Sequence, residues 1–128
     1  MRPIKGNPPP EWATALIERV CAGEGRREPR QVQWWHSKDA YSSGRYWDGE
    51  KRLHITAGTM ELDQEMVLLH ELGHHLARPT WHHNKRYWEL TFKLYDRYGS
   101  YGLMAWAVVR EGEMHAKANT EAEAYRYP

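Results

Sequence analysis

The sequence predicts an α+β domain in which a small antiparallel sheet of about three strands packs against about four helices. Two patterns carry this prediction. Between residues 31 and 56, strand-type alternation is interrupted by Ser-Ser-Gly and Asp-Gly turn signals. On both sides of that region, apolar residues recur at three- and four-residue steps, as they do along one face of a helix. The chain has 128 residues, which suits one domain over residues 1–128 with a single modest core.

The N-terminal part is expected to be an extended lead-in followed by a first helix. Residues 1–10 are rich in proline, which favours extended backbone. Residues 11–21 then carry apolar side chains at helical spacing, and Gly23-Glu24-Gly25 ends the helix. Cys21 is the only cysteine, so it has no internal disulfide partner and is expected to be a small core residue.

Three strands are predicted next. Gln31 to His36 alternates apolar and polar residues, and Arg45-Tyr46-Trp47 and Arg52 to Thr56 flank an Asp48-Gly49 pair. Asp-Gly between strand-forming residues is a strong hairpin signal. The strand that ends at Thr56 should lead into the next helix.

Three further helices complete the expected fold. The first runs through Leu76, with Asp63 as its possible N-cap, and ends before Arg78-Pro79 because the residue before proline disfavours helical backbone. Gly73 inside it is costly for a helix, so we expect another element to pack closely there. A second helix spans Lys85 to Tyr98, and a last one begins near Tyr101.

The stretch His70-Glu71-Leu72-Gly73-His74 contains the motif H-E-x-x-H. On a helix, His70 and His74 lie one above the other on the same face and can reach one metal ion together. Glu71 sits beside them, where it can touch a water on that metal without being a ligand. This arrangement predicts a zinc hydrolase, with His70 and His74 as ligands of one Zn²⁺ per chain and Glu71 as general base.

Catalytic zinc usually takes a third protein ligand. His75 is a poor choice, because it points about 100° around the helix from His74. His83 is our choice, since it stands at the mouth of the next helix, where the returning chain would pass the metal. His82 and a glutamate of the last helix stay open as alternatives, the glutamates being Glu111, Glu113, Glu121 and Glu123.

The HELGHH stretch followed by His83-Asn84-Lys85-Arg86-Tyr87-Trp88 resembles the SprT-like and YgjP-like zinc metallopeptidases of the zincin superfamily. The resemblance implies a minimal zincin-like fold, ligands at His70, His74 and His83, and Glu71 as the base. Family members that act on DNA-crosslinked proteins often carry a zinc ribbon, which this chain cannot form with its single cysteine. HELGHH is also typical of ImmA/IrrE-type regulatory peptidases, whose pattern would make a C-terminal glutamate the third ligand.

The expected activity is hydrolysis of peptide bonds in a protein or peptide substrate by a metal-activated water. The strand ending at Thr56 is the expected edge for binding an extended substrate by β-augmentation. Four residues are candidate donors to the oxyanion that forms during attack. They are Tyr41, Arg78, His82 and Tyr87.

Two other classes of function stay open. One is a metal-bound protein without proteolysis, although such a protein does not need Glu71. The other is a nucleic-acid-associated module, in which basic residues and aromatics form a stacking surface. The basic residues would be Arg26, Arg27, Arg30, Lys85 and Arg86.

Charge and hydropathy bear on the partners and the compartment. The formal net charge of +1 gives little support for nucleic acid as a partner. With no apolar run of transmembrane length and no signal-type segment at the N-terminus, no membrane partner and a cytoplasmic location are expected.

Overall fold

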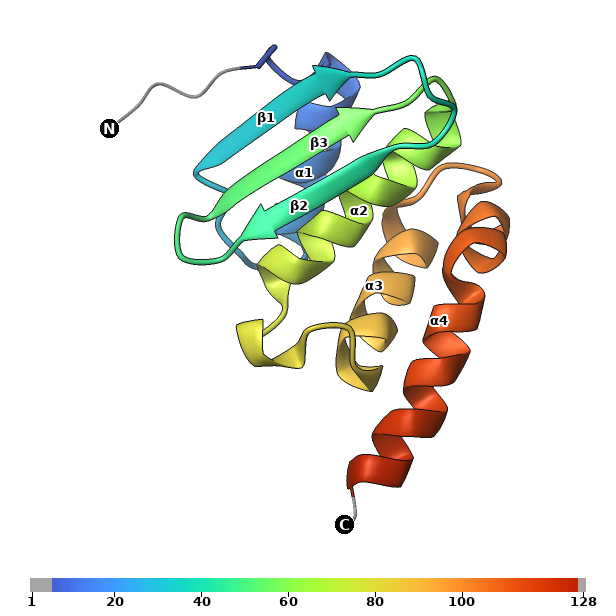
Figure 1. Ribbon diagram of the computed structural model, residues 1–128. Coiled ribbons are helices and arrows are strands. Elements are labelled where there is room, and N and C mark those ends of the chain that lie inside the picture. The colour runs from blue at the N-terminus through green and yellow to red at the C-terminus, as the bar shows by residue number, and fades with distance from the viewer. Residues whose placement is uncertain (1–5, 127–128) are drawn as a thin grey trace.

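The computed structural model describes residues 6–126, and the side chains of residues 6–118. It confirms an α+β architecture of three strands and four α-helices, with one short 3₁₀ helix between α2 and α3. All four α-helices lie on one side of the sheet, with α1 and α2 directly behind it (Figure 1). In chain order the elements are α1 (Glu11–Gly23), β1 (Gln31–His36), β2 (Ser43–Trp47), β3 (Arg52–Ala57), α2 (Glu61–Leu76), η1 (Pro79–Trp81), α3 (Lys85–Tyr98) and α4 (Leu103–Arg126).

The sheet has the strand order β1-β3-β2 and is mixed rather than wholly antiparallel. β2 and β3 form the predicted antiparallel hairpin, but β1 runs parallel to β3, so the prediction was wrong for β1. The reason is topological. After β1 the chain crosses to the far edge before turning back, so β3 enters the sheet between its two predecessors. The alternation of β1 is the same in either orientation, whereas the Asp48-Gly49 signal fixes only the hairpin.

The core lies between the sheet and the helices, and it continues from α1 and α2 to buried residues of α3 and α4. Leu53, Ile55 and Ala57 alternate along β3 and are all buried, as expected for one face of a strand. They belong to one cluster with the apolar residues of α1 and α2. Cys21 is part of this cluster, as predicted, and burial raises the pKa of its thiol to about 11. A buried thiol of that kind is chemically inert.

Two residues of α2 set how this helix meets its neighbours. A Cβ built on Gly73 would overlap Thr91 Oγ1 on α3, which confirms the close packing predicted at this glycine. Asp63 is not the N-cap, because α2 begins at Glu61. Asp63 is buried in the first turn instead and accepts hydrogen bonds from the Ser42 amide at 2.6 Å and from Trp106 Nε1 at 2.8 Å. It therefore ties α2 to the loop before β2 and to α4.

Within residues 6–126, no helix combines the length and the apolar composition that crossing a bilayer requires.

A carboxylate at the end of α1 links this helix to α3 and should make stability depend on pH. Glu24 accepts a hydrogen bond from the Tyr98 hydroxyl at 2.8 Å and ion-pairs with Lys93 and Arg97 at 3.2 and 3.0 Å. Burial alone would raise its pKa, but these three partners together lower it. Because the pKa is lowered in the folded state, the stabilisation is present above the unfolded pKa of about 4.3 and is lost as pH falls through the folded value.

We therefore expect Glu24→Gln to lower the free energy of unfolding by about 1 kcal/mol at pH 7, and by progressively less below about pH 4. Urea denaturation of both proteins between pH 3 and pH 7 measures this difference. A difference that stays constant over that range would show that the charge of Glu24 does not stabilise the fold.

Candidate metal centre

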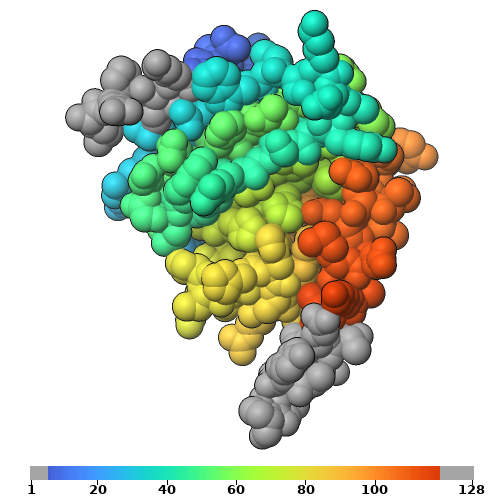
Figure 2. Space-filling model, in the orientation of Figure 1, coloured from blue at the N-terminus to red at the C-terminus, as the bar shows by residue number. Residues whose placement is uncertain are grey.

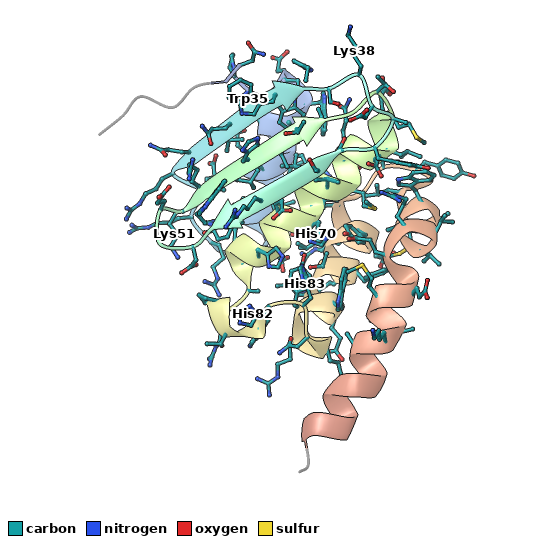
Figure 3. The ribbon with its side chains drawn as sticks, viewed as in Figure 1. Trp35, Lys38, Lys51, His70, His82 and His83 are labelled. Atoms are coloured by element: carbon teal, nitrogen blue, oxygen red, sulfur yellow. The ribbon has the colours of Figure 1, made fainter. Side chains whose placement is uncertain are left out.

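Three histidine side chains converge at the C-terminal half of α2. His83 Nε2 lies 3.0 Å from His74 Nε2 and 3.3 Å from His70 Nε2. One ligand atom from each residue lies within 4.8 Å of the other two. Figure 3 shows His70 and His83 side by side between α2 and the start of α3. Nitrogens that share a tetrahedral zinc ion at about 2.0–2.1 Å are separated by roughly 3.3 Å, so the two separations from His83 are close to those of a zinc site.

The local sequence explains how the third histidine reaches the other two. α2 ends at Leu76, and Pro79 opens the short η1 helix. Asn84 then caps α3, because its side-chain oxygen accepts a hydrogen bond from the Tyr87 amide at 3.0 Å. His83 immediately precedes this cap, so the start of α3 fixes its position.

Aromatic side chains of α3 hold the histidines in place. The ring of Tyr87 stacks on His74 with centroids 4.2 Å apart and an interplanar angle of 12°. Its hydroxyl donates to the His70 carbonyl at 2.8 Å. Trp88 stacks on His83 at 5.6 Å. Since the Tyr87 hydroxyl is buried and already engaged, Tyr87 supports the site rather than serving as an oxyanion donor.

A buried carboxylate from α4 completes the support of His70. Glu111 Oε2 lies 2.7 Å from His70 Nδ1, and the Tyr95 hydroxyl donates to Glu111 Oε1. Because the carboxylate accepts, Nδ1 carries the hydrogen and the Nε2 lone pair is free for a metal. Burial alone would lower the pKa of His70, but the hydrogen bond and the charge of Glu111 raise it.

Glu111 is therefore a partner of His70, and not one of the three clustered donors. The sequence predicts Glu111 only as an alternative third ligand, and this role differs from that prediction. A signal was present, because Leu103, Ala107 and Glu111 recur at four-residue steps and all three are buried. A carboxylate on a buried helix face requires a partner. Of the other acidic candidates, Glu113 is exposed, and Glu121 and Glu123 lie outside the side chains that the structure describes.

We expect Glu111→Gln to weaken zinc binding about 10–100-fold, because an amide next to His70 Nδ1 has lost the charge that raises the basicity of the ring. Competition for zinc against a chromogenic chelator measures the affinity. Glu113→Gln, on the exposed side of the same helix, is the matched control and should bind zinc like the wild type. Equal affinity of the Glu111 variant would show that this contact does not tune the site.

Glu71 lies next to the histidines and is also buried. Burial raises the pKa of its carboxyl to about 7, the charge of His70 opposes this shift, and Glu111 adds to it. The edge strand β2 approaches closely at this point. A Cβ built on Gly44 would lie 2.8 Å from Glu71 Cγ and 3.0 Å from its Oε2. Gly44 thus leaves room for the carboxylate, a function that the sequence did not reveal.

An open cleft of about 370 Å³ gives access to these groups. It lies between β2 on one side and the η1 segment on the other. In Figure 2, atoms of α2 are visible between these two walls. Besides the three histidines and Glu71, the lining consists of Gly44, Arg45, Tyr46, Asp48, Arg78, Pro79 and His82.

Of the remaining donor candidates, Arg78 and His82 line the cleft and Tyr41 does not. Tyr41 instead stacks on Trp106 and lies under the Arg110 guanidinium, 4.0 Å from it. The strand that ends at Thr56 is the central one, so the expectation that it offers a free edge was wrong. The edge beside the cleft is β2.

His75 stands outside the cluster, as expected. Its Nε2 lies 2.6 Å from the Arg27 carbonyl, which can only accept. In the neutral ring Nδ1 is then the acceptor, and it receives the Tyr46 hydroxyl at 2.8 Å. This bond orients Tyr46 on the β2 wall of the cleft.

Comparisons with protein-family models, with curated proteins and with solved structures find no match for this chain.

Proposed function

We propose that this chain is a zinc-dependent metallopeptidase, with His70, His74 and His83 as metal ligands and Glu71 as general base. One observation carries the proposal. Three histidines, with His83 Nε2 3.0 and 3.3 Å from the Nε2 atoms of the other two, stand beside a buried carboxylate at the floor of an open cleft. Such a constellation is what metal-assisted hydrolysis requires. The three histidines, and the position of His83 just before the N-cap of α3, also support kinship with the SprT-like and YgjP-like zincins.

A zinc ion in this site would supply Lewis acidity and lower the pKa of a water molecule to about 7. Glu71 would accept the proton of that water as its oxygen attacks the peptide carbonyl, and would pass it on to the leaving amine. Glu111 keeps His70 in the tautomer that a metal ligand needs. Arg78 and His82 are the lining side chains available to donate to the developing oxyanion.

The substrate would lie along β2. This strand pairs only with β3 within the described chain, so its outer edge has main-chain groups available for an extended peptide. Gly44 on this strand lies directly against Glu71. A peptide paired to β2 would therefore have its backbone beside the base.

Two alternatives have less support. A regulatory peptidase with a glutamate as third ligand would leave His83 without a purpose, although His83 Nε2 lies 3.0 and 3.3 Å from the other two donor atoms. A metal-bound module without proteolysis would not need Glu71 against the edge strand.

Metal analysis of the purified protein tests the proposal. Elemental analysis should give about one zinc per chain for the wild type, and His83→Ala should lose it or bind it much more weakly. His82→Ala is the matched control, since it removes the neighbouring imidazole and should retain zinc. Cleavage of casein by the zinc-loaded protein, and its loss on chelation, completes the test. A wild type that takes up no zinc when supplied with it would refute the proposal.

A further inference from the structure

Two arginines lie on opposite walls of the cleft. Arg45 lies on β2 and Arg78 follows the end of α2, and both are exposed and line the cleft. Among the described side chains, neither forms an ion pair. The guanidinium of Arg45 lies 4.9 Å from the ring of Trp47, a contact that steadies the side chain but leaves its charge available.

The acidic groups of the cleft do not balance these charges. Asp48 is paired with Lys51 at 2.8 Å. Glu71 is buried at the floor, beside His70. The charge that an incoming peptide meets on the two walls is therefore positive.

The cleft has few apolar side chains with which to recognise a peptide. Tyr46 and Pro79 are the apolar side chains of the lining, and carbon atoms of its polar residues contribute further apolar surface. The Tyr46 hydroxyl is engaged with His75. Pockets that select large apolar side chains enclose them, whereas this cleft is open. Arginine, in contrast, binds a carboxylate through two parallel hydrogen bonds with defined geometry.

We propose that the cleft selects peptide segments with acidic side chains flanking the scissile bond, held between Arg45 on one wall and Arg78 on the other. The statement about cleavage rests on the proposed function, whereas the statement about binding can be measured without catalysis. Successive side chains of a strand point to opposite faces, so Arg45 lies on the opposite face of β2 from Gly44 and Tyr46. In a peptide paired to β2, side chains that point to the same face as Arg45 would lie beside it. The peptide backbone would pass Glu71, and Arg78 would face the peptide from the other wall.

Binding to the zinc-loaded Glu71→Gln variant separates recognition from cleavage. Three fluorescein-labelled peptide pools of the same length are compared by fluorescence anisotropy. Each pool has two variable residues at its centre, and these are flanked by Glu in the first pool, by Gln in the second and by Lys in the third. We expect the Glu pool to bind at least about tenfold more tightly than the Lys pool, and the difference to shrink with added salt. Arg45→Glu and Arg78→Glu, each made in the Glu71→Gln variant, should abolish or invert the preference.

Arg30→Glu in the same background is the matched control. Arg30 is exposed and precedes β1, at the opposite edge of the sheet from the cleft, so the preference should persist. Zinc content, measured for every variant, should stay at the value of the parent. In the wild type, cleavage sites mapped by mass spectrometry on unfolded proteins should be enriched in Asp and Glu.

The outcomes distinguish the two proposals. Equal binding of the Glu and Lys pools, together with cleavage by the wild type, would overturn the acidic preference and leave the peptidase intact. A preference that disappears in the arginine variants, without cleavage of any peptide, would support recognition and overturn the peptidase. An oligo(dT) strand that binds more tightly than the Glu pool and displaces it would assign the arginines to nucleic acid and overturn the acidic preference.

Discussion

Replacing Glu71 with glutamine is expected to lower kcat for peptide hydrolysis by about 10²–10⁴-fold while one zinc per chain is retained. Glu71 lies beside the three clustered histidines but is not in their group, so the change removes the proposed base and spares the proposed ligands. The amide has nearly the volume of the carboxylate and fits the same space against Gly44. The proposed substrate contacts on the cleft walls are unchanged, so KM should move little.

Glu89→Gln is the matched control for this experiment. Glu89 is exposed on α3 and does not line the cleft, so the same loss of charge should leave kcat within a factor of two of the wild type. Initial rates on one fluorogenic peptide, with zinc quantified in each sample, compare the three proteins. Undiminished hydrolysis by zinc-loaded Glu71→Gln would show that another group moves the proton.

Local signals in the sequence were sufficient for the elements and for the histidines. The H-E-x-x-H spacing places His70 and His74 on one helix face whatever the rest of the fold, and Pro79 ends the helix by sterics alone. His83 could be chosen as the third donor because the connection between the two helices is short and has few residues that can return to the metal site. The three donors chosen from the sequence are therefore the three that the structure brings together.

Features that depend on long-range packing could not be predicted in the same way. The parallel pairing of β1 with β3 depends on the route of the chain between strands, and the alternation of β1 is the same for either direction. Glu111 reaches His70 across 41 positions of sequence. The contact of Gly44 with Glu71 depends on which strand forms the edge. Each of these features needs the tertiary arrangement of at least two elements.

Gly73→Ala is expected to lower the free energy of unfolding by about 1–3 kcal/mol, although alanine is the better helix former. The added Cβ would overlap Thr91 Oγ1, and it would lie 3.2 Å from Tyr87 Cε2. Thr91 and Tyr87 are both fully buried, so α2 and α3 must separate or these side chains must move. Tyr87 stacks on His74, and zinc affinity should therefore fall together with stability.

A double-mutant cycle with Thr91→Ala tests this origin of the effect. Removing the hydroxyl takes away the atom that the new Cβ meets, and the remaining Thr91 Cβ lies at an acceptable 3.4 Å. Gly73→Ala should then cost much less in the Thr91→Ala background than in the wild type, so the two changes should be coupled by about 1 kcal/mol or more. Urea denaturation and zinc affinity are measured for all four proteins. If the two changes were additive, the contact between α2 and α3 would not be the reason for glycine inside the motif helix, and the backbone freedom of Gly73 would have to be tested in its place.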